Sequence, residues 1–179
     1  MLKPNNTAFV LVDVQGRLAT LMYDKQSLFS NLQKLIKSLQ ILGVPIIWLE
    51  QMPQAIGTTS TVLASLLPKQ QPIVKSSFSA WANNEFVDAV MASGANSILV
   101  AGIEAHVCVY QTATDLFDNG FDVEVIADAV SSRSSANKNI ALTKMQQYGL
   151  KLSSTEMALF ELMGNAESKA FKQIIKIIK

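Results

Sequence analysis

The sequence predicts an α/β fold: a doubly wound, mostly parallel six-stranded sheet with helices on both faces. Apolar runs of strand length alternate with longer segments of helical spacing along all 179 residues. Most of the short runs are continuously apolar, which is typical of parallel strands that are covered on both faces. No repeat, linker or low-complexity segment interrupts this pattern, so we expect one domain over residues 1–179.

The individual elements follow from the same pattern. The runs predicted as strands are residues 8–13, 45–50, 72–75, 97–102, 122–128 and 150–154. The segments predicted as helices are residues 26–43, 83–94, 107–120, 136–149 and 155–164, and each ends on a glycine, as expected of a helix C-terminal cap. The C-terminal lysines 169, 172, 176 and 179 are spaced as on the solvated face of a terminal helix, which is favoured over a helix lying on a membrane.

Composition narrows the function classes. The net charge of +1 and the absence of a basic stripe give no reason to expect a nucleic-acid partner. No run approaches the ~18 apolar residues of a membrane span, and the apolar N-terminal run ends at Asp13, too early for a signal peptide, so we expect no membrane partner. The single cysteine excludes an internal disulfide and suits a reducing cytoplasm, where we expect the protein to reside.

The chain is also apolar for its size, with a mean hydropathy of +0.25. Segment 51–68 holds more apolar side chains than a short surface excursion needs: Ile56, Val62, Leu63, Leu66 and Leu67. These features predict a homo-oligomer in which a neighbouring subunit supplies part of the pocket wall. The alternative is that these side chains cover one edge of the sheet within the monomer.

Ionisable side chains stand where several predicted strands end. Ligands of such folds bind beyond the carboxyl ends of the parallel strands. Asp13 ends the first strand, Glu50 and Gln51 end the second, Lys75 ends the third, and the turn 102–108 follows the fourth. These groups converge only if their strands are neighbours, which the sequence alone does not prove.

Cys108 and His106 are the only cysteine and the only histidine of the chain. Cys108 falls in the first turn of a predicted helix, where free backbone N–H groups and the helix dipole favour a thiolate and can form an oxyanion hole. A buried structural thiol is the alternative. In the first turn of a helix, side chains two residues apart, such as His106 and Cys108, point in directions that differ by ~200°. We therefore expect His106 to be a substrate-pocket or surface residue rather than the base.

Asp13 and Lys75 complete the candidate chemistry. A carboxylate at the half-buried end of a strand should have a raised pKa, which suits a general base, although a helix N-cap is the alternative. A phosphatase of the haloacid-dehalogenase type would need a second aspartate where this chain has Gln15. Lys75 at a strand end would ordinarily be exposed, but Phe78 and Trp81 are placed to wall an apolar pocket around it.

Three stretches together carry a resemblance to a known family: "AFVLVDVQG" (8–16), "KSSFSAW" (75–81) and "GIEAHVCVYQTATDLFDNGFDVEVIADAVSS" (102–132). The last is the most specific, because it fits the pattern G-(I/V)-x-x-x-x-C-V-x-x-T-A followed by G-(F/Y)-x-V and a strand ending in D-A. Over nearly its whole length the chain resembles the isochorismatase-like cysteine hydrolases, which include nicotinamidases and N-carbamoylsarcosine amidases.

The resemblance implies a catalytic triad of Asp13, Lys75 and Cys108. It also implies a non-proline cis peptide between Ile103 and Glu104, and an oxyanion hole made by the N–H groups of Glu104 and Cys108. Nicotinamidases bind a metal through an Asp-x-His cluster after the second strand. Here that place reads "EQMPQAIGTT", without histidine, so we expect neither a metal nor another cofactor.

A further departure concerns the reaction. True isochorismatases cleave a vinyl ether and lack the nucleophilic cysteine, so Cys108 puts this chain on the amidase side. The segment "LEQMPQAIGTT" looks most like the poorly characterised hydrolases of the family. The side chains expected to contact a small-molecule substrate are Leu18, Gln51, Phe78, Trp81 and His106.

The predicted function is hydrolysis of a small amide or related C–N bond through a covalent thioester. Asp13 is expected to take the thiol proton, and the charge of Lys75 to lower the pKa of both Asp13 and Cys108. The alternative is a non-enzymatic or redox-sensing oligomeric module that retains the fold. An activated Cys108 would alkylate well below about pH 8.5, whereas an inert buried thiol would not.

Overall fold

The computed structural model describes the whole chain, residues 1–179, and contains one six-stranded sheet. Its strands are β1 (Thr7–Val12), β2 (Ile46–Gln51), β3 (Ile73–Lys75), β4 (Ser97–Ile103), β5 (Asp122–Ser131) and β6 (Lys151–Ser153). Neighbouring strands all pair in parallel, in the order β3-β2-β1-β4-β5-β6. The predicted doubly wound α/β fold is therefore confirmed, and the sheet is wholly rather than mostly parallel.

β1 and β4 form the topological switch point at the centre of the sheet. The chain winds from β1 outward through β2 to β3, and from β4 in the opposite direction through β5 to β6. The pairing of β1 with β4 extends to Val12 opposite Gly102, so the carboxyl ends of these two strands lie side by side. Ligands of open α/β sheets bind at such a point, and the adjacency on which the predicted site depends is present.

Gly102 allows β1 and β4 to approach each other closely. Its φ is +124°, and a Cβ atom built on it would lie 2.1 Å from the carbonyl oxygen of Val12. Any other residue at this position would push the two central strands apart.

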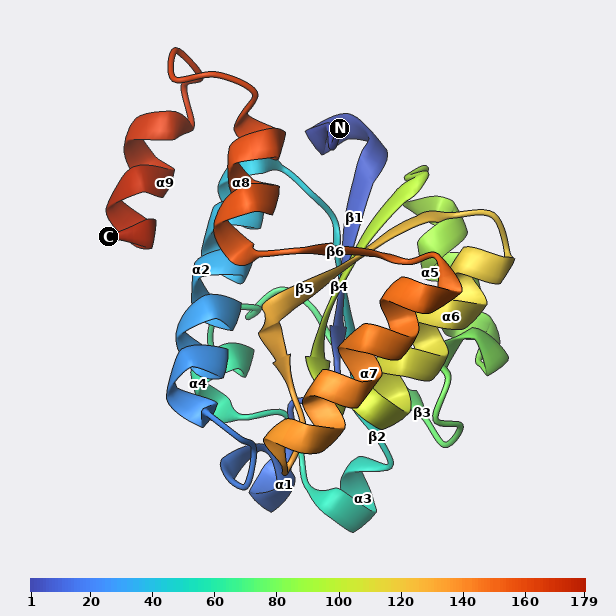
Figure 1. Cartoon of the computed structure of the whole chain (residues 1–179). Helices are drawn as coiled ribbons and strands as arrows, with labels where there is room; N and C mark the ends of the chain where they lie inside the picture. Colours follow the sequence, from blue (N-terminus) through green and yellow to red (C-terminus); the bar gives the residue numbers. More distant parts are fainter.

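Helices cover both faces of the sheet (Figure 1). α2 (Lys25–Leu42) and α8 (Thr155–Met163) form one layer, and α5 (Asn84–Ala92), α6 (Tyr110–Asp118) and α7 (Ser135–Tyr148) form the other. The five glycines expected at helix ends all have a positive φ. A single cluster of 50 buried hydrophobic residues fills the space between the layers and the sheet. Every residue of β1 is buried, which accounts for its continuous apolar run.

α9 (Phe171–Ile178) packs on the outside of α2 (Figure 1). It buries Ile174 and Ile178, while Lys172 and Lys176 are exposed, so the prediction of a terminal helix with a solvated lysine face is confirmed. None of the helices combines the length and the apolar character needed to span a lipid bilayer.

Several short elements have no counterpart in the sequence prediction: α1 (Gly16–Thr20), α3 (Pro53–Ile56), α4 (Thr61–Ala64), and the turns η1 (Pro4–Asn6) and η2 (Ala80–Ala82). A third turn, η3 (Ala105–Val109), overlaps the start of the helix predicted over residues 107–120. Elements of three to five residues are too short to show a helical period. Within the apolar segment 51–68, Leu63 and Leu67 are buried in the monomer, whereas Ile56 and Val62 are 36% and 49% exposed. Leu63 and Leu67 therefore fit the monomeric explanation of this segment, while Ile56 and Val62 remain accessible on the surface.

Candidate active site

The structure brings Asp13, Lys75 and Cys108 together at the carboxyl edge of the sheet. Asp13 follows β1, Lys75 ends β3, and Cys108 lies in η3 directly after β4. The Nζ atom of Lys75 lies 2.7 Å from Oδ2 of Asp13, and both side chains are buried. Cys108 is close enough for its thiol and the Asp13 carboxylate to affect each other's pKa.

Lys75 is held by more acceptors than it has protons. Its ammonium donates to Asp13 Oδ2 and to Gln51 Oε1, both at 2.7 Å. The carbonyl oxygens of Ser77 and Phe78 accept from it at 3.2 and 3.3 Å. An ammonium has only three protons to share among these oxygens, so the Lys75 side chain is fixed and fully satisfied although buried.

The Asp13 carboxylate has one occupied and one free oxygen. Oδ2 accepts a hydrogen bond from the ammonium of Lys75, while Oδ1 is buried and has no hydrogen-bond partner. Burial raises the pKa of Asp13, and the charge and hydrogen bond of Lys75 only partly offset this. Asp13 also has a left-handed backbone, with a φ of 49°. A carboxylate with a raised pKa and a free oxygen is suited to accept a proton from Cys108.

Cys108 differs from its prediction in two respects. It lies in a π-helical turn, Ala105–Val109, rather than in the first turn of an α-helix. Burial, followed by the negative charge of Asp13, raises the pKa of Cys108 to about 12, and the opposing charge of Lys75 is too weak to prevent this. The charge of Lys75 lowers the pKa of both Asp13 and Cys108, as predicted, but burial outweighs it in each group. The resting group is a protonated thiol, which needs Asp13 to ionise it.

The backbone beside Cys108 offers a place for an oxyanion. The peptide bond between Ile103 and Glu104 is cis. The N–H group of Glu104 donates none of the hydrogen bonds in the structure, so it is free to bind a ligand oxygen. The Glu104 side chain binds Arg133: its Oε2 accepts from the backbone N–H of Arg133 at 2.9 Å and from Arg133 Nε at 3.2 Å.

His106 is hydrogen-bonded to residues outside the Asp13–Lys75–Cys108 cluster. Its Nδ1 lies 2.9 Å from Ser132 Oγ, and its Nε2 lies 3.5 Å from Asn137 Nδ2. No hydrogen bond joins it to Cys108 or Asp13. Leu18 lies half-buried on α1, just beyond the end of β1.

Two of the residues expected to contact substrate, Trp81 and Gln51, make contacts within the protein. The Trp81 ring packs edge-to-face against Phe86 and Phe121, with centroids 6.4 and 5.8 Å away. Phe121 precedes β5, so the Trp81 ring lies toward the amino edge of the sheet and does not wall the site. Gln51 uses both ends of its side chain within the protein, because its amide also donates to the carbonyl of Ser76 at 2.7 Å. Phe78 is 57% exposed, which leaves it available to a ligand or a neighbouring subunit.

Buried polar residues that the sequence does not mark as functional shape the loop after β2. Gln15 is fully buried and binds the backbone of Gln51 and Gly57. Glu50 accepts from the N–H and hydroxyl of Thr59, at 2.6 and 2.7 Å. A glutamine two residues after a strand-end aspartate was the one available signal for Gln15, and its sequence position alone does not show burial.

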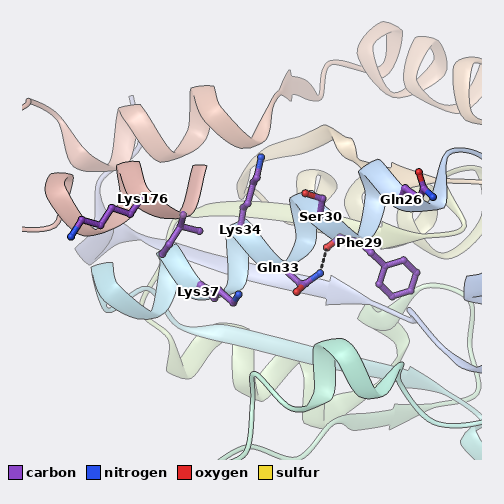
Figure 2. A pocket seen from close by; sticks show the side chains of 8 residues that line it. Gln26, Phe29, Ser30, Gln33, Lys34, Lys37 and Lys176 are labelled. Atoms are coloured by element: carbon purple, nitrogen blue, oxygen red, sulfur yellow. Dashed lines mark hydrogen bonds between the residues drawn. The ribbon is translucent and has the colours of Figure 1, made fainter. Parts of the chain in front are cut away.

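The hollows described here are not lined by Asp13, Lys75 or Cys108. One of about 510 Å³ lies between α2 and α9 and is lined by side chains that include Gln33, Lys34, Lys37 and Lys176 (Figure 2). Another of about 450 Å³ contains Trp81. No group of three or more His, Cys, Asp or Glu side chains is arranged to hold a metal ion.

Comparison with known proteins places the chain in a family. A model of the isochorismatase domain matches residues 7–157. Isochorismatase domain-containing protein 2 of Bos taurus is 34% identical over 177 residues, which cover 98% of this chain and 84% of the relative. The structure of MAR1 ribonuclease from Caenorhabditis elegans is 33% identical, with a TM-score of 0.92 over 99% of this chain and 91% of that one.

A second solved structure has the same fold at lower identity. The octameric YcaC hydrolase of Escherichia coli, of unknown specificity, is 26% identical, with a TM-score of 0.92 over 98% of this chain and 89% of that one. The domain match, the curated relative and the shared fold agree with the resemblance found in the sequence: the chain belongs to the isochorismatase-like cysteine hydrolase family.

Proposed function

We propose that the protein is a cysteine-dependent hydrolase that cleaves a small amide or related C–N bond through a thioester on Cys108. The observation that carries this proposal is the buried Lys75–Asp13 pair, which leaves Asp13 Oδ1 without a partner beside a protonated thiol. A nucleophile, a base and a fixed cation are the groups that covalent acyl transfer needs.

The first half of the reaction forms the thioester. Asp13 Oδ1 takes the thiol proton as the sulfur of Cys108 attacks the carbonyl carbon. The negative charge on the former carbonyl oxygen is stabilised by the backbone N–H groups of Glu104 and Cys108. When the tetrahedral intermediate collapses, the C–N bond breaks and the leaving amine takes the proton from Asp13. The ammonium of Lys75 stays in place throughout and holds the carboxylate.

The second half restores the enzyme. Asp13 takes a proton from water, whose oxygen attacks the thioester carbonyl. The C–S bond then breaks, the acid product leaves, and the sulfur regains its proton from Asp13. All proton transfers use one carboxylate, which matches a group whose pKa is raised toward neutral pH.

Trapping the acyl-enzyme tests this function. The protein is incubated with a panel of small amides, ureas and carbamoyl compounds, quenched in acid and weighed by intact-mass spectrometry. A substrate is expected to add its acyl mass at Cys108 and to release its amine, while Cys108→Ala stays unmodified. An RNA oligonucleotide belongs in the panel because the C. elegans relative is described as a ribonuclease. RNA cleavage that persists in Cys108→Ala would contradict the proposal.

The redox-sensing alternative is less favoured by the geometry. Cysteines that sense oxidants are exposed and have a low pKa. Cys108 is buried, and its pKa is raised to about 12. A thiol that ionises only when a neighbouring base takes its proton suits catalysis better than sensing.

We further propose a homo-oligomer in which a neighbouring subunit covers the carboxyl edge of the sheet. Exposed apolar side chains cluster in the elements that follow β1 and β2, including Leu21, Tyr23, Met52 and Ile56. The related YcaC hydrolase is octameric. Sedimentation at micromolar concentration is expected to show a species at least twice the chain mass of 19.5 kDa. A single species near 19.5 kDa would refute the oligomer and leave the pocket within one chain.

A further inference from the structure

Gln51 sits on the ammonium of Lys75 as a second side-chain acceptor beside Asp13. Its Oε1 and Asp13 Oδ2 each lie 2.7 Å from Nζ. The two carbonyl oxygens that complete the set are farther away, at 3.2 and 3.3 Å. Asp13 and Gln51 therefore accept the two shortest hydrogen bonds of the ammonium, and a change in one acceptor changes how strongly Lys75 binds the other.

Gln15 fixes the backbone from which Gln51 reaches Lys75. β1 pairs with β2 only as far as Leu11 opposite Trp48, so β1 offers Gln51 no strand partner. The Gln15 side chain takes that place. Its Oε1 accepts from the Gln51 N–H at 2.6 Å, and its Nε2 donates to the Gln51 carbonyl at 3.1 Å.

The same amide also holds the loop that follows β2. Gln15 Nε2 donates to the carbonyl of Gly57 at 2.7 Å, and the Gln15 side chain is completely buried. Only an amide can accept from one backbone group and donate to two others at this position, since a carboxylate has no proton and a methionine no donor. Among the residues around the Lys75 ammonium, the Gln15 side chain therefore binds Gln51, and it does so through the Gln51 backbone.

We propose that Gln51, held by Gln15, is a positioning residue that shares the Lys75 ammonium with Asp13 and so sets the pH range in which Asp13 can accept the Cys108 proton. This inference rests on the proposed function, in which Asp13 is the base. It assigns Gln51 to positioning rather than to substrate contact, and it gives Gln15 an indirect role, through the backbone of Gln51.

The acid limb is the low-pH part of the rate–pH profile, in which the rate falls as Asp13 becomes protonated. Two substitutions of Gln51 should move this limb in opposite directions. Gln51→Glu adds a second carboxylate to Lys75, which raises the pKa of Asp13 and moves the acid limb up by about one pH unit. Gln51→Met removes an acceptor, so Lys75 binds Asp13 more strongly. This lowers the pKa of Asp13 and moves the limb to lower pH. Gln15→Met should move the limb in the same direction as Gln51→Met, by a smaller amount, because Gln51 is loosened rather than lost.

The rate of Cys108 modification by iodoacetamide, followed from pH 4 to 9 by intact mass, measures this limb without a known substrate. Gln33→Glu on α2 makes the same charge change away from the site and should leave the profile unchanged. A structural role for Gln51 would lower the rate at every pH and leave the limb in place. Profiles of both Gln51 variants that superimpose on wild type would overturn the proposal.

The two proposals fail separately. If small amides form an acyl-enzyme but the limb does not move, the role of Gln51 is wrong and the hydrolase proposal stands. If no amide ever acylates Cys108, the hydrolase proposal fails, while a shifted limb still establishes the coupling of Gln51 to Asp13. Where the added charge of Gln51→Glu prevents folding, the uncharged Gln51→Met carries the test.

Discussion

Replacing Cys108 by alanine is expected to reduce turnover by at least about a thousandfold, because the nucleophile of a cooperating set has no substitute. The fold should survive, since only a buried sulfur is removed from a turn that backbone hydrogen bonds define. Steady-state kinetics on a substrate found in the acylation panel, with circular dichroism as the folding check, gives the result.

His106→Ala is the matched control for this substitution. His106 is bonded to Ser132 and Asn137 rather than to the reacting groups, so its loss should change KM or substrate preference more than kcat. Turnover of Cys108→Ala within tenfold of wild type would refute the covalent mechanism. Damage from His106→Ala as severe as that from Cys108→Ala would restore a Cys–His dyad.

Replacing Lys75 by methionine is expected to cost about 3–5 kcal/mol of folding free energy, because it leaves the buried Asp13 carboxylate without its cation. Lys75 and Asp13 have side-chain exposures of 0% and 4%, so solvent cannot replace the lost partner. Urea unfolding at pH 5 and pH 8 measures the loss. Asp13→Asn/Lys75→Met, which removes both charges, should recover most of the stability.

The loss should depend on pH with a definite sign. Burial already raises the pKa of Asp13, and the loss of Lys75 raises it further. The folded state then favours the protonated acid, so the variant is relatively more stable in acid and loses stability as the pH rises through the raised pKa. An equal loss at both pH values, with no recovery in the double variant, would show that Lys75 contributes packing rather than charge.

The large elements of this protein can be predicted from the sequence, and so can the strand-end residues that come together at the carboxyl edge of the sheet, because both have strong local signals. The continuous apolar run before Asp13 reports a strand buried on both faces, and the burial of β1 confirms it. Adjacency of β1 and β4 could not be predicted from either strand alone, since pairing depends on the path of the whole chain. The sequence predicts an α-helix from residue 107 and does not reveal the π-helical turn Ala105–Val109, because such a turn has no distinctive composition.

The errors in the site share one cause, which is that burial and side-chain direction are tertiary properties. The prediction for Cys108 weighed the helix terminus and Lys75 but not desolvation, which proved the larger influence on its pKa. Trp81 follows Lys75 by only six positions, so the sequence predicts that it lies near Lys75. Its ring instead packs with Phe121 toward the other edge of the sheet. The side chain of Gln51, which ends a strand, is hydrogen-bonded to Lys75 and Ser76, and its sequence position does not reveal these contacts.

The left-handed backbone of Asp13 decides which substitution can isolate its carboxylate. At a φ of 49° a Cβ atom crowds the following carbonyl, which costs most residues about 1–2 kcal/mol but is tolerated best by aspartate and asparagine. Asp13→Ala would therefore mix the loss of a base with a relaxation of the chain just before Gln15. Asp13→Asn keeps both the shape and the backbone preference of the residue and replaces the carboxylate by an uncharged amide. Of the two substitutions, it is the one whose kinetic effect does not include a change in backbone preference.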